Sequence, residues 1–191
     1  MKRWKIILGL FILAIMVSAC VTKESSTGNI EGGKKLIVYY SLTENTKFVA
    51  EYIQSLTGAD IFKLELIEPY SVEFDKTIAR LNSEREAGIL PELSSRIDNI
   101  TDYDIIFIGT PNWFGTLSTP LLAFLASHDL SSKTIVPFVT FGSGGFQNTI
   151  THLKTALPDS TILEEFGVAG NNANNSRENI SQWLSLIGII K

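Results

Sequence analysis

The feature that most constrains the fold of this chain is an alternation of short β-prone runs with helix-like segments. The continuous apolar run at residues 36–40 is typical of a strand that is buried on both faces of a sheet. Five β-prone runs occur, at residues 36–40, 62–66, 105–108, 135–141 and 161–166. Apolar residues recur with helical spacing at residues 48–56, 74–81, 120–126 and 180–187. This pattern predicts an α/β fold, with a doubly wound five-stranded parallel sheet and helices on both faces.

Three details refine this prediction. In the run 62–66, apolar residues alternate with Lys63 and Glu65, which predicts a half-exposed strand at a sheet edge. Pro137 removes a hydrogen-bond donor from what should be an interior strand, where proline is rarely tolerated. The crossover helix is expected to carry three apolar residues on one face: Phe74, Ile78 and Leu81.

The N-terminus has the layout of an export signal. A basic start is followed by the apolar stretch 6–17, which is shorter than the roughly 20 residues of a comfortable membrane span. The sequence Val-Ser-Ala-Cys at 17–20 resembles a bacterial lipobox, and Cys20 is the single cysteine of the chain. Two alternatives stay open, namely an ordinary signal peptide with an incidental cysteine and a short uncleaved anchor.

The lipobox resemblance implies an extracytoplasmic protein that is lipid-anchored to the bacterial cell membrane through Cys20. The stretch after Cys20 is rich in Ser, Gly, Thr, Asn and Glu, which is typical of a flexible tether. The predicted division is a signal peptide at 1–19, a tether at 20–34 and a folded domain at 35–191.

Charge and composition exclude several function classes. The formal net charge is −4, and cleavage before Cys20 would leave −7, which excludes a generic basic nucleic-acid binder. One cysteine and two histidines exclude a disulfide framework and argue against a structural zinc site. We expect His128 and His152 to be surface residues, and we nominate no side chain as an acid, base or nucleophile.

Three loops follow predicted strands and should meet at one edge of the sheet, where α/β proteins bind ligands. The first loop offers the hydroxyls of Ser41, Thr43 and Thr46 and the amide of Asn45 at a helix N-terminus, a favourable anion site. It contains no Lys or Arg, so it would bind a phosphate group through neutral donors. The alternative is an ordinary helix N-cap.

The second and third loops suggest a planar ligand. Residues 109–115 carry two large aromatic residues, Trp113 and Phe114, between glycines, and stacking on a ring would explain them. The alternative is a tryptophan that folds back onto the domain. Residues 140–146 are rich in glycine, which lets the backbone approach a ligand, although a tight turn would also use glycine.

Together these loops resemble those of the flavodoxin-like family, in particular short-chain, single-domain bacterial flavodoxins. The resemblance covers about residues 35–190 and includes the crossover segment 68–75 and the residues 102–104 before the third strand. It implies FMN as cofactor and the strand order 2-1-3-4-5, with no insertion in the last strand. The implied cofactor-binding residues are Ser41, Thr43, Glu44, Asn45, Thr46, Thr110, Pro111, Asn112, Trp113, Phe114, Gly115, Phe141, Gly142, Ser143, Gly144 and Gly145.

One residue departs from the family pattern. Where the family usually has Thr-Gly-Asn-Thr, this chain has Glu44 between Thr43 and Asn45. A carboxylate that points inward would repel a phosphate, and a positive φ at Glu44 would cost about 1 kcal/mol. Glu44 could also point to solvent.

The family resemblance implies an electron-transfer protein whose partner is a redox protein or a small-molecule electron acceptor, with no nucleic acid. The alternative is an FMN-dependent NAD(P)H or quinone reductase on the same fold, since a fold does not fix a function. A third class is a binding module that has lost the flavin, for which Glu44 is the supporting feature.

Overall fold

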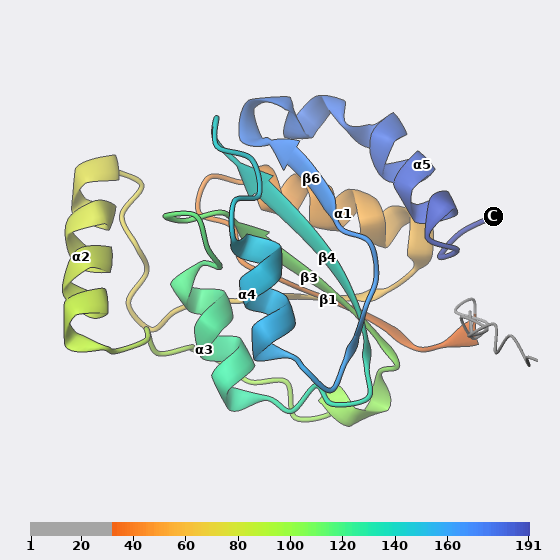
Figure 1. Ribbon diagram of the computed structural model, residues 1–191, viewed down its shortest axis with the longest axis horizontal. Helices are drawn as coiled ribbons and strands as arrows, with labels where there is room; N and C mark the ends of the chain where they lie inside the picture. Colours follow the sequence, from red (N-terminus) through yellow and green to blue (C-terminus); the bar gives the residue numbers. More distant parts are fainter. Residues whose placement is uncertain (1–31) are drawn as a thin grey trace, which may run out of the picture.

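The computed structural model describes residues 32–191, so Cys20 and the predicted signal peptide lie outside the described residues. Its centre is a parallel sheet in the order β2-β1-β3-β4-β5, with β6 also paired to β4 (Figure 1). This confirms the predicted fold class and strand order. The strands are β1 (Lys35–Tyr39), β2 (Asp60–Lys63), β3 (Ile105–Pro111), β4 (Thr134–Phe141), β5 (Thr161–Ile162) and β6 (Phe166–Ala169).

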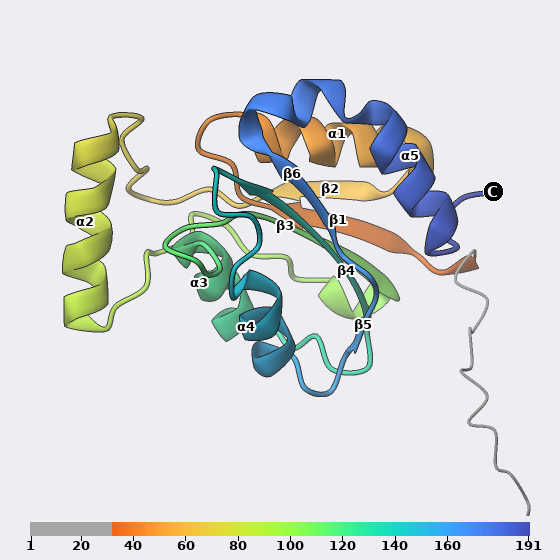
Figure 2. The same cartoon turned by 45° about the horizontal axis from the view of Figure 1, so that its top comes forward.

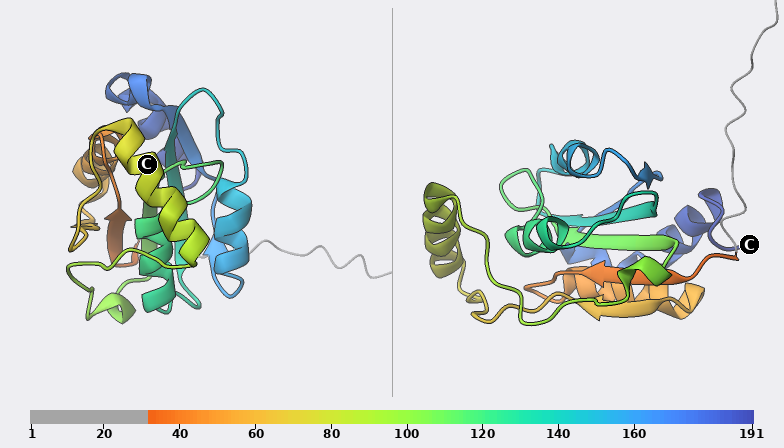
Figure 3. Two further views of the ribbon diagram at one scale, coloured as in Figure 1. Left: turned by 90° about the vertical axis from the view of Figure 1, so that its left-hand side faces the viewer. Right: turned by 90° about the horizontal axis from the view of Figure 1, so that it is seen from below.

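Helices cover both faces of the sheet. One layer contains α1 (Asn45–Thr57) and α5 (Arg177–Leu186), and the other contains α3 (Thr119–Ser127) and α4 (Thr149–Ala156) (Figure 1). Because side chains alternate along a strand, Ile37 and Phe107 pack toward α1 and α5, whereas Val38 and Ile106 pack in the opposite layer. Figure 3 shows the sheet between these two layers. Single 3₁₀ segments precede β3 (Ile100–Asp102) and follow β6 (Gly170–Asn175).

The fifth position of the sheet explains how Pro137 is tolerated in β4. The run predicted as one strand at 161–166 is instead divided into β5 and β6, which pair with different halves of β4. The carbonyl of Ile135 accepts a hydrogen bond from the amide of Leu163, so the backbone of Ile135 points to the β5 side of β4. The backbone nitrogen of Pro137, two residues further along the strand, points to the same side of β4. At that level β5 has ended and β6 begins only opposite Phe138. The missing N–H of Pro137 therefore leaves no strand partner without a donor.

The crossover helix α2 (Phe74–Ala87) stands apart from the other helices at one end of the molecule (Figures 1 and 2). Of the three apolar residues expected on one face of this helix, Leu81 is buried, whereas Phe74 is 77% exposed. The residues of α2 that are buried are Thr77, Leu81 and Glu84.

Buried polar contacts hold α2 in place. Arg80 Nε donates to Glu84 Oε1 at 2.7 Å, and the Arg80 guanidinium lies 4.2 Å from the centre of the Tyr70 ring. The Tyr70 hydroxyl donates to Glu84 and lies 2.7 Å from the Thr119 hydroxyl at the start of α3. These polar contacts, together with the packing of Leu81 in the core, therefore fix the position of α2 against the body.

Two further expectations can be compared with the structure. An edge strand, β2, does occur, but it spans Asp60–Lys63 and overlaps the predicted run 62–66 only at its first two residues; Leu64 and Leu66 are buried beyond the end of β2. His152 is exposed, whereas His128 is half-buried, packs on Phe124 and accepts a hydrogen bond from the amide of Ile97 at 3.3 Å. Among residues 32–191, no helix has both the length and the apolar character needed to cross a membrane.

Candidate functional site

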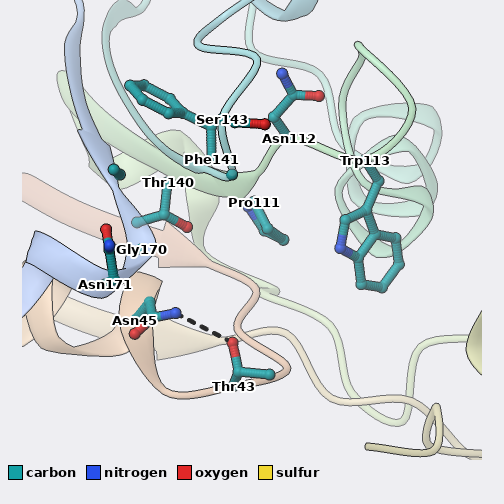
Figure 4. A pocket seen from close by; sticks show the side chains of 12 residues that line it. Thr43, Asn45, Pro111, Asn112, Trp113, Thr140, Phe141, Ser143, Gly170 and Asn171 are labelled. Carbon is teal, nitrogen blue, oxygen red and sulfur yellow. Dashed lines mark hydrogen bonds between the residues drawn. The ribbon is translucent and has the colours of Figure 1, made fainter. Parts of the chain in front are cut away.

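The loops that follow β1, β3 and β4 meet at the carboxyl edge of the sheet, as predicted, around a cavity of about 530 Å³. A volume of this size is typical of a small-molecule site. Figure 4 shows the side chains that converge on it. The lining residues are Thr43, Asn45, Pro111, Asn112, Trp113, Thr140, Phe141, Gly142, Ser143, Ala169, Gly170 and Asn171.

The first loop turns directly into α1. Glu44 has a φ of 64°, in the left-handed region, and this turn brings Thr43 and Asn45 together at the cavity (Figure 4). Asn45 Nδ2 donates to Thr43 Oγ1 at 3.3 Å. The hydroxyl of Thr46 is buried and lies 2.8 Å from that of Thr140, which ties the loop to the end of β4.

The carboxylate of Glu44 does not line the cavity. It forms an ion pair with Lys47 on the next turn, and its side chain is 60% exposed. The hydrogen bond and charge of Glu44 raise the pKa of Lys47. The backbone of Glu44 therefore shapes the loop, while its charge is directed to solvent and partly balanced by Lys47.

Ser41 lacks a hydrogen-bond partner for its side chain within the described part of the chain. Its hydroxyl oxygen is buried and has no hydrogen-bond partner among the described residues. A buried hydroxyl normally has a partner, so an unpaired one at the start of an anion-type loop indicates a missing acceptor or donor. Ser41 itself lines a neighbouring groove on the β2 side and not the main cavity.

The second loop is a hairpin whose tip is Phe114 and Gly115. Their φ values are 52° and 80°, and the backbones of Trp113 and Thr116 exchange hydrogen bonds of 3.1 and 3.0 Å, as in a type I′ turn. Gly115 fits this geometry without strain, but a bulky residue such as Phe114 rarely adopts a positive φ. Phe114 is 54% exposed and lies outside the lining of this cavity.

The position of Trp113 agrees with both interpretations of the second loop, namely packing against the domain and contact with a ligand. Trp113 folds back onto the domain, where its ring makes edge contacts with Tyr40 at 5.4 Å and Tyr70 at 5.2 Å between centres. It also lines the cavity, and Figure 4 shows its indole among the lining side chains. The two tyrosines thus hold in place an aromatic side chain that remains available to a ligand.

Hydrogen bonds link the second loop to the third. Asn112 donates from its backbone to the carbonyl of Thr140 at 2.8 Å and from Nδ2 to the carbonyl of Gly145 at 2.7 Å. Gly145 has a φ of 66° in the turn, and neither it nor Gly144 is among the residues that line the cavity. Thr110 is buried below the loop, where its hydroxyl donates to the Ser118 hydroxyl at 2.9 Å.

A fourth segment, which the sequence reasoning missed, closes the cavity. Ala169 ends β6, Gly170 and Asn171 follow it, and the segment lies against the first loop. A Cβ atom at Gly170 would stand 2.7 Å from Asn45 Nδ2, so glycine permits this close approach. The signal was present, because small and amide residues follow the last strand run at the same sheet edge. Thr140 also lines the cavity; it was placed in the third loop but not among the implied cofactor-binding residues.

The cavity is lined by uncharged side chains, several of which can donate hydrogen bonds. None of the described residues that line it carries a charge. Within residues 32–191, no cluster of His, Cys, Asp and Glu could hold a metal ion. The cavity combines hydroxyl and amide groups near a helix N-terminus with one aromatic side chain on either side, Trp113 and Phe141. This arrangement suits a planar ring that carries a phosphate group.

Comparisons with known proteins agree with this geometry. The family model described as Flavodoxin matches residues 34–187. A candidate flavoprotein from Bacteroides eggerthii, known from its crystal structure, is 29% identical with a TM-score of 0.71, covering 81% of this chain and 98% of that one. A flavoprotein from Lactobacillus acidophilus, crystallised in complex with FMN, shares the fold at 23% identity and a TM-score of 0.62, covering 78% of this chain and 99% of that one.

Among curated sequences, an NAD(P)H dehydrogenase (quinone) from Syntrophobacter fumaroxidans is 25% identical over 134 residues. The match covers 68% of this chain and 63% of that protein, so the chain spans less than two thirds of this relative's length.

Proposed function

Because the chain belongs to the flavodoxin family, we propose that it binds FMN in the cavity at the carboxyl edge of the sheet and serves as an electron-transfer protein. The observation that carries this proposal is the convergence of the anion-type first loop and the two aromatic-bearing loops on one cavity. The cofactor would supply the redox chemistry, while the protein supplies orientation and electrostatics.

The residues present fit FMN. Thr43, Asn45 and the backbone N–H groups at the start of α1 would hold the phosphate, and the unpaired hydroxyl of Ser41 lies in the same loop. Trp113 would lie against the ring, since its position is fixed by Tyr40 and Tyr70. The ion pair of Glu44 with Lys47 removes the main objection to a phosphate at this loop.

The test is a titration of the purified apoprotein with FMN and with riboflavin, which lacks the phosphate. We expect riboflavin to bind at least about tenfold more weakly, a difference of about 1.4 kcal/mol. Trp113→Ala should weaken FMN binding by about 1–3 kcal/mol, the range measured for stacking on an aromatic side chain. Phe114→Ala, on the same hairpin but outside the cavity lining, is the matched control. Equal affinities for FMN and riboflavin would show that the first loop is only a helix cap.

A second candidate function is an FMN-dependent reductase of NAD(P)H or quinones. The observation in its favour is a second cavity of about 380 Å³ beside the first, which could hold a second substrate. A titration of the FMN-bound protein by spectroelectrochemistry separates the two functions. Fully reduced FMN carries a negative charge, and the cavity lining offers no cation to balance it.

We therefore expect the second one-electron step to occur at a lower potential than in free FMN. The shift is about 60 mV for each 1.4 kcal/mol of differential destabilisation. Two separated one-electron steps support a carrier. A single two-electron step at or above the free-FMN potential would support the reductase.

We also propose that the protein is anchored outside the cytoplasmic membrane by a lipid on Cys20, on the basis of the lipobox-like residues 17–20. Cys20→Ala should leave the precursor unprocessed by the lipoprotein pathway or release the protein to the soluble fraction. Mass spectrometry and membrane fractionation measure both effects. Unchanged mass and partitioning would refute the anchor without affecting the FMN proposal.

A further inference from the structure

One polar face of α2 holds the chain segment that carries Tyr70. Thr77 donates its hydroxyl proton to the carbonyl of Ser71. Arg80 Nη1 donates to the carbonyl oxygens of the two residues before Tyr70, at 2.7 and 3.3 Å. Glu84 accepts a hydrogen bond from the Tyr70 hydroxyl. Residues three or four apart on a helix are neighbours, so these side chains of α2 form one row that binds both the backbone of the segment and its tyrosine.

The hydroxyl of Tyr70 joins α2 to α3. It has a single proton, which it donates to the buried carboxylate of Glu84. The Thr119 hydroxyl, 2.7 Å away at the start of α3, is therefore the donor to Tyr70. Burial, and then the hydrogen bond to Glu84, raise the pKa of Tyr70, so the hydroxyl keeps its proton. The direction of both hydrogen bonds is thus fixed by the carboxylate of Glu84.

The ring of Tyr70 lies between α2 and the proposed FMN cavity. The Arg80 guanidinium covers a face of this ring, 4.2 Å from its centre. The ring meets that of Trp113 edge to face, with the centres 5.2 Å apart and the planes at 88°. Trp113 lines the cavity, whereas Arg80 and Glu84 do not (Figure 4). Because the preferred contacts of aromatic rings depend on their mutual orientation, a tilt of Tyr70 would also shift the indole of Trp113.

Glu84 suits this position because a carboxylate offers two acceptors. Oε1 accepts from Arg80 Nε at 2.7 Å, and Oε2 accepts from Tyr70. A glutamine side chain has the same shape but only one acceptor, so it would lose one of the two hydrogen bonds. The side chain of Glu84 is 8% exposed, and a buried ion pair adds little stability over apolar packing because desolvation opposes the attraction. The two directed hydrogen bonds do, however, hold the Tyr70 ring in one orientation.

We propose that Arg80 and Glu84 are positioning residues of the FMN site, which act through Tyr70 to fix the orientation of Trp113 against the flavin. The proposal rests on the proposed function in that FMN is the ligand of the cavity. The orientation of Trp113 in the apoprotein does not depend on that function. Neither Arg80 nor Glu84 lines the cavity, so a substitution there changes the flavin site without removing a contact to the flavin.

The experiment is a double-mutant cycle on the full chain with Glu84→Gln, Tyr70→Phe and the double variant. Two signals report on Trp113, namely the near-ultraviolet circular dichroism of the apoprotein and the quenching of FMN fluorescence on binding. Trp113→Phe identifies the part of each signal that comes from this indole. Glu84→Gln should change both signals and weaken FMN binding about three- to tenfold. In the Tyr70→Phe background, Glu84→Gln should weaken binding no further, because the hydroxyl through which it acts is absent.

Tyr70→Phe keeps the ring and removes only its hydroxyl, so it is the second single variant, with the same changes expected. Glu73→Gln is the matched control. In the described structure the Glu73 carboxylate pairs with Lys76 at the exposed start of α2 and not with Tyr70, so both signals and the FMN affinity should stay as in the wild type.

The proposal is overturned by any of three results. In the first, Glu84→Gln and Tyr70→Phe leave the dichroism and the quenching unchanged. In the second, Glu73→Gln alters them as much as Glu84→Gln does, which would indicate a general loosening of α2. In the third, the effect of Glu84→Gln persists in full without the Tyr70 hydroxyl. If the wild-type chain binds no FMN, the proposed function fails, and the dichroism of the apoprotein alone decides whether Glu84 positions Trp113.

Discussion

Glu44 combines an unfavourable backbone with a favourable side chain. Its φ of 64° places a non-glycine residue in the left-handed region, and its carboxylate is paired with Lys47. Glu44→Gly should raise the free energy of unfolding of the apoprotein by about 1 kcal/mol, because glycine adopts this conformation without the steric cost. Urea denaturation measures the change. Glu44→Ala is the matched control, since it removes the ion pair but keeps the strained backbone, and it should bring no gain.

Gly142 tests whether the third loop is shaped for a ligand. Its φ is not in the left-handed region, and a Cβ atom there would meet no described atom within 4 Å. The fold therefore does not require glycine at this position, although Gly142 lines the cavity. Gly142→Val should keep the wild-type melting temperature of the apoprotein and weaken FMN binding about tenfold by filling space at the cavity wall.

A thermal shift assay and an FMN titration on the same preparation measure both quantities for Gly142→Val. Gly144→Ala is not a suitable control, because its Cβ atom would stand 2.8 Å from Gln147 Nε2. Gly58→Val is also unsuitable, since Gly58 ends α1 with a φ of 65°. Ser143→Ala, a smaller change on the same loop, shows what loss of a side-chain hydroxyl does there. Unchanged FMN affinity in Gly142→Val would mean that this glycine faces solvent.

At the scale of the sheet, Gly109 and Phe138 are cross-strand partners in β3 and β4. A Cβ atom at Gly109 would lie 2.2 Å from Phe138 Cζ and 2.8 Å from Tyr39 Cβ, so the ring of Phe138 fills the space that glycine leaves. Gly109→Ala should destabilise the protein by about 1–3 kcal/mol through overpacking. The double variant Gly109→Ala with Phe138→Leu should recover part of that loss, which equilibrium denaturation of all four proteins would detect. Additive losses would show that the two residues are not coupled.

The elements that could be predicted from the sequence are those in which a single physical requirement, such as burial on both faces, determines the residue pattern. Burial on both faces makes 36–40 and 105–108 apolar throughout, and the structure confirms both as β1 and β3. Gly58 follows the helical pattern 48–56 and ends α1, because glycine is the residue that best adopts a left-handed C-cap. The meeting of the three loops at one sheet edge follows from parallel strands, and it is also confirmed.

Other features depend on tertiary contacts that a sequence pattern does not carry. The division of the last strand position follows from its pairing with β4, because β5 ends where Pro137 offers no donor. The face of α2 was assigned from apolar residues, whereas a buried carboxylate, Glu84, packs inward with Tyr70 and Arg80. Asn171 follows the last strand run at the expected sheet edge, but its approach to the first loop depends on the fold. The anchor at Cys20 stays a prediction.

The whole molecule should lose stability in alkaline solution through its buried tyrosines. Burial raises the pKa of Tyr39 and of Tyr40 from 10.0 to about 12. Nearby Glu51 raises the value for Tyr39 further, while Arg80 partly opposes the effect for Tyr40. The unfolded chain therefore loses these protons first, so the contribution to stability is complete below about pH 10 and is lost as the pH rises toward about 12.

Urea denaturation between neutral and alkaline pH measures this loss, and the absorbance of the phenolate follows the titration. Tyr39→Phe and Tyr40→Phe should each make the decline of the unfolding free energy above about pH 10 less steep. The unfolding free energy of each variant at neutral pH serves as its reference, so that the effect of the substitution on packing is subtracted. A decline of the same steepness in both variants would show that other groups govern the alkaline loss.

The described chain begins at the edge of the sheet opposite the cavity. Lys34, just before β1, donates its backbone N–H to the carboxylate of Asp104 at 2.9 Å, and its ammonium lies 3.9 Å from the carboxylate of Asp60. Since Asp60 begins β2 and Asp104 precedes β3, Lys34 lies at the edge where these strands begin. Figure 1 places the C-terminus near this same side. A domain fixed to an electrode through a tag before residue 32 would thus direct its cavity toward the solution, with the length of the strands between the surface and the cofactor. Direct electron exchange with that electrode should be slow, and a small diffusing mediator should restore the current.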